Sequence, residues 1–258
     1  ALGVGVGNAV ITVDDTADLD AAAEKIRISK TLDLAASCSS DNSVVLLDGI
    51  YDAMLDKLRA EGGYVCNAEE KTALRNTLWD DELHINTAMV AQPPEKIAQM
   101  AGLTIPEGVQ FFIVLEDGYG PEHPFSGEKL SVIMALYRAR DIDHAIELTR
   151  HIQAYQGQGH SCGIYSNNDH NIMKVAENTY TSRVMVNQPQ SASNSGNVWN
   201  GMRQTFSLGC GSWGGNGTNN NISWRDLINE TWVSLPLAEP KVIPSDEELF
   251  GDVIGQLG

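Results

Sequence analysis

The sequence predicts an α/β fold in which a mostly parallel sheet is covered by helices on both faces. Two observations predict it. Short apolar runs of strand length alternate with longer segments of helical period through most of the 258 residues. Helices between successive strands are the usual crossover connections of a parallel sheet. We expect one large domain or two small ones, with a core that needs no disulfides.

In the first half of the chain we expect two strands, at 9–13 and 44–47, and four helices, at 14–30, 49–60, 67–78 and 94–102. Leu19, Ala23 and Ile26 lie at helical spacing in the first helix. Asn67 and Glu70 match a capping box at the start of the third. The fourth begins at a proline and stops at a glycine, as helices often do.

In the second half we expect four strands, at 111–115, 132–139, 163–165 and 183–187, and two helices, at 141–155 and 171–179. Asp141 is the expected cap of the longer helix. Residues 188–221 are rich in Gly, Ser and Asn, which predicts long loops of the kind that often carry function. After Trp224, residues 231–237 are strand-like, and an acidic tail with several prolines follows.

Composition limits the partners. With 34 acidic and 17 basic residues, the formal charge of −17 argues against binding to nucleic acid or to an anionic membrane. The four cysteines show no CxxC pair and no Cys/His cluster of zinc-site spacing, so we expect free thiols and no metal. The first ten residues lack the basic segment of a signal peptide, and no apolar run reaches membrane-spanning length. We expect a cytoplasmic protein.

Cys38 is the first candidate for chemistry. It lies in a Ser-Cys-Ser-Ser string between an expected helix and an expected strand, and the small polar residues beside it, Ser37 and Ser39, leave room for a substrate carbonyl. The alternative is an inert buried cysteine, which is the commoner situation for a single cysteine near a strand. The functional interpretation predicts that Cys38 reacts as a thiolate in an open cleft.

Three more strings accompany Cys38: PFSGEKLSVIMALYRA with Glu128, GQGHSCGIYS with His160, and SLGCGSWGGN from Ser207 to Asn216. Together with SKTLDLAASCSSDNSVVLLDGIYDAML, they resemble the catalytic half of the aldehyde dehydrogenase superfamily, in its CoA-acylating branch. The resemblance spans roughly residues 3–221. It implies an aldehyde dehydrogenase catalytic domain at 1–222, followed at 223–258 by a strand and acidic tail that serve oligomerisation.

The resemblance implies that Cys38 attacks an aldehyde, that hydride passes to NAD or NADP, and that the acyl group is transferred from Cys38 to CoA. Glu128 would bind the nicotinamide ribose, with Lys129 and Leu130 beside it at the rim of the cofactor cleft. His160 would assist proton transfer. The ordinary alternatives are a solvated acid for Glu128 and a structural histidine for His160.

Gly209, Cys210 and Gly211 would form the wall of the acyl pocket, where small residues let the backbone approach the ligand. Arg203 could pair with an anionic substrate tail, although an ordinary surface ion pair is the commoner role. Gly3 stands where hydrolytic members of the superfamily carry a general-base glutamate, which favours CoA over water as the acyl acceptor.

The resemblance also implies a missing part. Family members carry a Rossmann-type cofactor domain of similar size before this region, together with the asparagine of the oxyanion hole. We therefore expect the chain to be a C-terminal portion that binds NAD(P) weakly and is a poor catalyst alone. The alternatives left open are a hydrolytic dehydrogenase that yields a carboxylic acid, and a non-catalytic assembly module. In each case a homodimer or larger homo-oligomer is expected.

Overall fold

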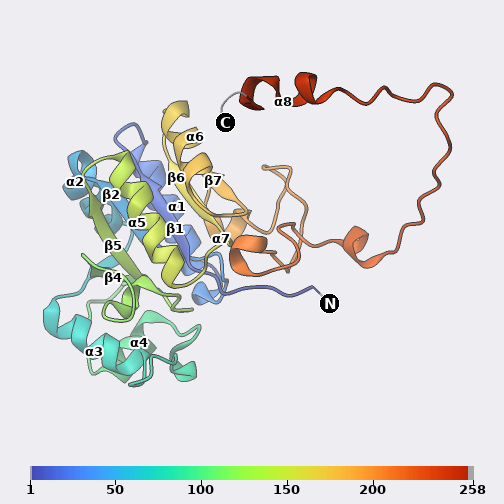
Figure 1. The fold of residues 1–258 in the computed structure, drawn as a ribbon. Helices are drawn as coiled ribbons and strands as arrows, with labels where there is room; N and C mark the ends of the chain where they lie inside the picture. The colour runs from blue at the N-terminus through green and yellow to red at the C-terminus, as the bar shows by residue number, and fades with distance from the viewer. Residues whose placement is uncertain (1, 255–258) are drawn as a thin grey trace. The chain divides into compact units, whose positions relative to one another are not determined.

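The computed structural model describes residues 2–254 (Figure 1). The chain divides after Ser223 into two units, which are described separately. The first unit holds the sheet and all of the expected site residues. The second, from Trp224 onward, consists of a short 3₁₀ turn, an extended stretch and one helix, α8 (Asp246–Ile254).

The first unit is built on one sheet of seven strands in the order β3-β4-β5-β2-β1-β6-β7, and every neighbouring pair is parallel. The strands are β1 (Ala9–Val13), β2 (Asp41–Leu47), β3 (Gly63–Val65), β4 (Phe111–Leu115), β5 (Ile133–Ala139), β6 (Cys162–Tyr165) and β7 (Val184–Val186). The predicted parallel α/β fold is therefore confirmed.

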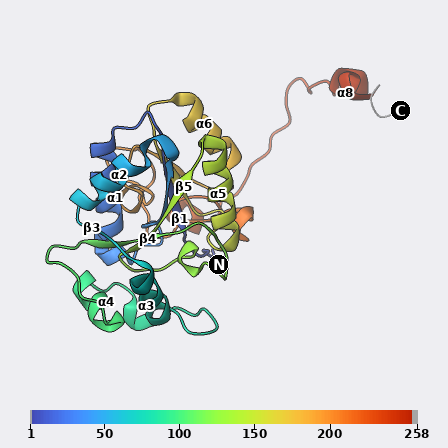
Figure 2. The same ribbon diagram turned by 90° about the vertical axis from the view of Figure 1, so that its left-hand side faces the viewer.

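Helices cover both faces of this sheet, with α1 and α2 on one side and α5 and α6 on the other (Figure 2). The remaining helices of the unit, α3 and α4, pack against each other, and the short α7 packs on α1. The helices are α1 (Leu19–Thr31), α2 (Tyr51–Ala60), α3 (Ala68–Leu78), α4 (Pro94–Ala101), α5 (Ile142–Tyr155), α6 (Asp169–Asn178) and α7 (Gln190–Ser193). The central strands β1 and β2 are buried along their whole length, as this two-sided cover requires.

Local signals place the helix ends well. Asn67 accepts hydrogen bonds from two backbone N–H groups of α3 while Glu70 accepts one from the Asn67 N–H, which completes the expected capping box. Asp141 caps α5 as predicted, and Gly102 ends α4 in the left-handed conformation. The first helix begins later than expected, because Asp18 is its N-cap and residues before it form a turn.

Three expectations were wrong or incomplete. Residues 188–221 contain α7 and a 3₁₀ turn at Ser212–Gly214 within the predicted loops. The short edge strand β3 and the tail helix α8 were missed. The predicted strand at 231–237 is absent, and its apolar side chains, including Trp232 and Val233, are exposed, because a lone extended segment has no neighbouring strand to hydrogen-bond.

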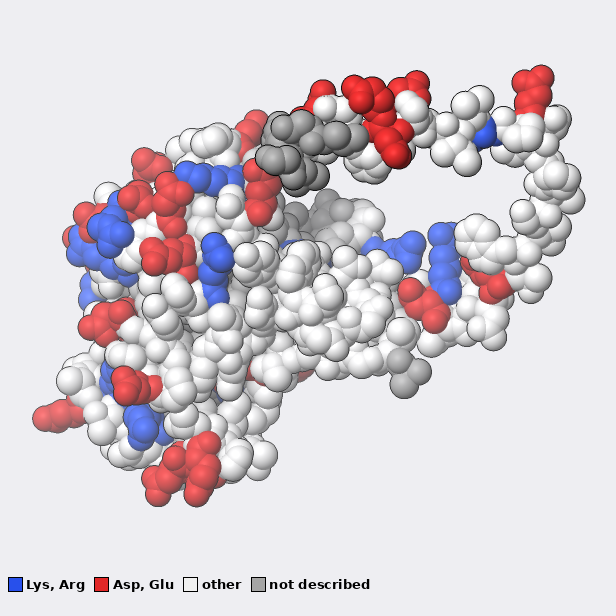
Figure 3. All heavy atoms as spheres, in the orientation of Figure 1, with Lys and Arg blue, Asp and Glu red and all other residues white. Residues whose placement is uncertain are grey.

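Charged side chains are unevenly spread over the first unit. Figure 3 shows acidic and basic groups over the region of α2, α5 and α6 and over that of α3 and α4, whereas the region of α7 and the loops after it carries few. All four cysteines are free thiols, as predicted. Among the described residues, no helix combines the length and the apolar character needed to cross a membrane.

Candidate active site

Most of the expected site residues come together because their segments precede strands at the same edge of the sheet. Gly7 lies just before β1, Cys38 before β2, Glu128 before β5 and His160 before β6. These four strands are adjacent in the order β5-β2-β1-β6 and all parallel, so their amino ends meet. Ligands of open α/β sheets more often bind at the carboxyl ends, so the pattern of strands alone would have pointed to the opposite edge.

Cys38 and His160 are in direct contact across 122 residues of sequence. The Cys38 Sγ lies 3.2 Å from the His160 Nε2, and the His160 Nδ1 lies 2.9 Å from the Ser161 Oγ. His160 and Ser161 are buried, whereas Cys38 is half-buried. When the Ser161 oxygen accepts the Nδ1 proton, the Nε2 lone pair faces the thiol, which is the arrangement of a base beside a nucleophile.

The electrostatics of this pair favour two neutral groups in the resting chain. Burial, assisted by the positive charge of Arg183, lowers the pKa of His160 to about 4. Burial and, next, the negative charge of Glu128 raise the pKa of the Cys38 thiol above its ordinary value. Both groups are therefore neutral near pH 7. Desolvation disfavours both charged partners of a resting ion pair, and the expected reaction of Cys38 as a thiolate stays a prediction.

Glycines bring the chain close around the thiol. A Cβ at Gly7 would lie 2.2 Å from the Cys38 carbonyl oxygen, and one at Gly5 would lie 3.2 Å from the Cys210 Sγ. At Gly159, next to His160, a Cβ would lie 2.0 Å from the Cys210 carbonyl oxygen. Side chains at these positions would displace Cys38 or Cys210, so the glycines permit the close packing of the site.

Glu128 faces the same region. It is half-buried, its N–H donates to the Gln156 Oε1 at 3.0 Å, and the Gly7 N–H hydrogen-bonds to its carboxylate. Burial raises the pKa of Glu128 to about 7. A carboxyl group beside the thiol, poised between its two protonation states, is the kind of group found at functional sites.

The residues after Glu128 are placed differently from each other. Lys129 is fully buried, and its ammonium donates to the carbonyl oxygens of Phe125 and Gly127 at 2.6 and 2.7 Å. Leu130 is half-buried with a positive φ of 47°. The expected role of Lys129 and Leu130 at the rim of the cofactor cleft stays a prediction. Because the Lys129 side chain is buried, only its backbone could contribute to that rim.

The expected substrate-binding residues surround Cys38 and Cys210. The side chain of Ser39 hydrogen-bonds to the Cys38 sulfur, and its Oγ lies 3.3 Å from the Ser37 Oγ. Gly209 and Gly211 flank the buried Cys210, and the Gly211 φ of 64° requires a residue without a Cβ. Their contact with substrate stays a prediction.

Arg183 is the residue that sequence reasoning missed. Its guanidinium is buried and donates to the His160 carbonyl oxygen at 2.9 Å, to the Gly209 carbonyl oxygen at 2.7 Å and to the Asn221 Oδ1 at 2.8 Å. One side chain thus joins the backbone of the histidine segment to the glycine-rich loop. No sequence signal marked it, since it precedes an ordinary short strand.

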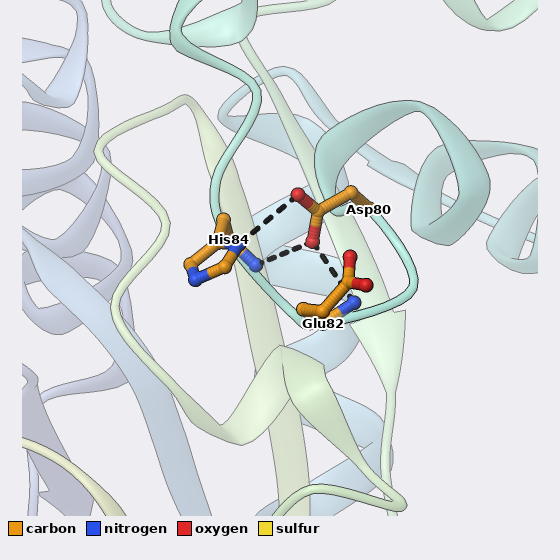
Figure 4. Close-up of side chains that lie close together, drawn as sticks. All are labelled: Asp80, Glu82 and His84. Atoms are coloured by element: carbon orange, nitrogen blue, oxygen red, sulfur yellow. Dashed lines mark hydrogen bonds and ion pairs between the residues drawn. The ribbon is translucent and has the colours of Figure 1, made fainter.

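Other polar sites lie apart from these residues. A pocket of about 600 Å³ is lined mainly by α5 and by none of the expected site residues. Asp80, Glu82 and His84 lie close together in an exposed turn, where the Asp80 carboxylate accepts the N–H groups of Glu82 and His84 (Figure 4). These bonds account for the turn itself.

Comparison with known proteins supports the resemblance. No protein-family model matches the chain. It is 40% identical over 260 aligned residues to the acylating sulfoacetaldehyde dehydrogenase of Cupriavidus necator. That alignment covers 100% of this chain and 52% of the Cupriavidus necator protein. It is 33% identical to the acetylating succinate-semialdehyde dehydrogenase of Clostridium kluyveri, over 97% of this chain and 55% of that protein.

Solved structures agree. An acetylating aldehyde dehydrogenase from Geobacillus thermoglucosidasius is 30% identical and superposes with a TM-score of 0.87, over 94% of this chain and 53% of that one. A structure described as a probable aldehyde dehydrogenase from Listeria monocytogenes superposes with a TM-score of 0.89, over 93% of this chain and 52% of that one. The chain spans about half the length of these proteins. Over nearly all of its own length it is homologous to acylating aldehyde dehydrogenases.

Proposed function

We propose that the protein oxidises an aldehyde to an acyl-CoA, with Cys38 as the nucleophile and His160 as its base. The contact between the Cys38 Sγ and the His160 Nε2, at 3.2 Å, is the observation that carries this proposal. As the sulfur adds to the aldehyde carbon, the thiol proton passes to the neutral imidazole, so no separated charges exist before the substrate arrives. The product is the alkoxide form of a thiohemiacetal on Cys38, with the former thiol proton on His160.

Loss of a hydride from the carbon of this alkoxide would leave a neutral thioester on Cys38. NAD(P), when bound, would supply the hydride acceptor. One group beside Cys38 fits a nicotinamide riboside: the Glu128 carboxyl can accept hydrogen bonds from ribose hydroxyls. NAD and NADP are equally compatible with these residues.

The thioester retains the activation of the acyl group, which passes to the thiol of CoA as Cys38 is released. Gly3 supports CoA rather than water as the acceptor, because no carboxylate stands there to activate water. Relatives that accept sulfoacetaldehyde or succinate semialdehyde make these two aldehydes the first substrates to test.

The test is NADH or NADPH formation by the full-length protein with each aldehyde, in the presence and absence of CoA, with mass spectrometry of the product. We expect acyl-CoA to form only when CoA is present and Cys38→Ala to abolish it, with Cys66→Ala as the matched control. Free carboxylic acid as the main product would instead establish a hydrolytic enzyme. Undiminished turnover by Cys38→Ala would refute the assignment of the nucleophile.

A further inference from the structure

A second pocket of the first unit, of about 320 Å³, is lined in part by Arg183, which contacts the backbone of His160 and Gly209. Its lining includes two arginines, Arg183 and Arg203, and the three asparagines at 219–221, and it includes no aspartate or glutamate. This composition is unusual for a chain with twice as many acidic as basic residues.

Arg183 is a buried cation without a carboxylate partner among the described residues. It is 5% exposed, and its hydrogen bonds go to carbonyl and amide oxygens, which carry only partial charges. A buried charge usually has a counter-ion, because desolvation of a lone ion costs several kcal/mol. The positive charge therefore favours an anion in the adjoining pocket.

Arg203 supplies a second positive charge at the same pocket. Its side chain is exposed, and no ion pair of Arg203 is found within residues 2–254. Asn221 links the two arginines, because its Oδ1 accepts from the Arg183 Nε at 2.8 Å and its Nδ2 donates to the Arg203 carbonyl oxygen at 2.8 Å. The amides of Asn219 and Asn220 are exposed at the same surface and can donate further hydrogen bonds.

We propose that this pocket binds an ionised oxyanion group of a reactant, either the sulfonate or carboxylate tail of the aldehyde or a phosphate of CoA. The identity of the reactant rests on the proposed function. The binding of an anion in the pocket does not. Guanidinium groups and amide donors match the oxygens of all three groups. Since Arg183 also holds the His160 and Gly209 backbone, an anion bound there would lie next to the segments that surround Cys38.

Binding is tested first, on this chain and without any turnover. Methanesulfonate is titrated while the backbone and side-chain amide NMR signals of Asn219 and Asn220 are followed, with uncharged dimethyl sulfone as the control ligand. We expect saturable shifts with methanesulfonate only, weakened by added NaCl. Arg203→Gln should raise the Kd about tenfold, as the loss of a charge-assisted hydrogen bond does, whereas Arg203→Lys should retain most of the affinity.

Arg75→Gln is the matched control, since Arg75 is exposed and does not line the pocket. Saturable binding that Arg203→Gln leaves unchanged, or shifts that do not saturate, would overturn the proposal.

Turnover by the full-length protein then identifies the reactant. A higher KM of Arg203→Gln for sulfoacetaldehyde, with KM unchanged for propanal and CoA, assigns the pocket to the aldehyde tail. A higher KM for CoA with every aldehyde assigns it to a phosphate of CoA. Unchanged KM values for all three would overturn the role in catalysis. If the full-length protein shows no CoA-dependent oxidation at all, the proposed function fails, while the titration still decides whether the pocket binds anions.

Discussion

Cys38 and His160 face each other as neutral groups, and this determines how the thiol should respond to pH. Because burial and Glu128 raise the Cys38 pKa, its thiolate forms mainly above the ordinary range for cysteine. Because the His160 pKa is lowered to about 4, no imidazolium is present near neutrality to promote ionisation. The chain therefore lacks the low-pKa thiolate of cysteine–histidine ion pairs.

We expect the rate of Cys38 alkylation by iodoacetamide to rise continuously from pH 6 to pH 10, without a plateau beginning near pH 7. Mass spectrometry of the labelled peptide measures this rate. Cys66 is the internal reference, since it is buried and its pKa is raised to about 12, so it should be labelled more slowly at every pH. A plateau below pH 8 would show that the resting pair is ionised.

Gly7 offers a steric test of the same site. A Cβ at Gly7 would lie 2.2 Å from the Cys38 carbonyl oxygen, so Gly7→Ala must displace the Cys38 segment or the segment before β1. We expect alkylation of Cys38 to change by severalfold and stability to fall by about 1–3 kcal/mol, the usual cost of overpacking. Gly3→Ala is the control, because nothing lies within 4 Å of its added Cβ. Equal behaviour of the two variants would contradict this packing.

At the scale of single elements, helix α3 depends on its capping box. Asn67→Ala removes the acceptor for two N–H groups and should lower the free energy of unfolding by about 1 kcal/mol. Urea denaturation measures the loss. Asn76→Ala, on an exposed part of the same helix, should have a much smaller effect. Cys38 alkylation should be unchanged in both, since none of the expected site residues lies in α3.

The segment that carries His160 is held by long-range hydrogen bonds rather than by a local cap. The segment before β6 is hydrogen-bonded through Arg183 to the loop around Gly209, so its position depends on a side chain that directly precedes β7. A second long-range hydrogen bond joins α7 to α1, because the Ser191 N–H donates to the Ser29 side chain at 3.2 Å. These links join elements that are far apart in sequence.

At the scale of the whole molecule, buried charge near the amino edge of the sheet should make stability depend on pH. Lys30 is fully buried, and no hydrogen-bond partner of its ammonium is found among the described residues. Burial lowers its pKa to about 7, against the opposing attraction of Asp41 and Glu128. Between pH 7 and about 10.5 the unfolded chain therefore binds more protons at this lysine than the folded chain does, and stability due to Lys30 increases as the pH rises.

Lys30→Met removes this dependence. We expect the variant to be more stable than the parent chain at pH 7, and the difference to shrink steadily toward pH 10. Thermal unfolding at a series of pH values measures it, with the exposed Lys25→Met as the control for loss of one positive charge. A constant difference across this range would show that Lys30 has an ordinary pKa in the folded protein.

The local sequence by itself determined most of the strands and helices up to β7, the caps at Asn67 and Asp141, and the motifs of Cys38, Glu128 and His160. These depend on residues within a few positions of each other, so periodicity and capping rules reach them. The sequence did not predict β3 or α8, and it wrongly predicted a strand at 231–237.

Only the tertiary structure decided the charge states of Cys38 and His160, the burial of Lys129 and the role of Arg183. Each depends on desolvation or on contacts made by residues from distant segments, and Cys38 and His160 are 122 positions apart. The parallel sheet brings these segments to one edge, and the burial that results changes their pKa values. Neither effect is encoded in a short run of residues, because both arise when the chain excludes water from that edge.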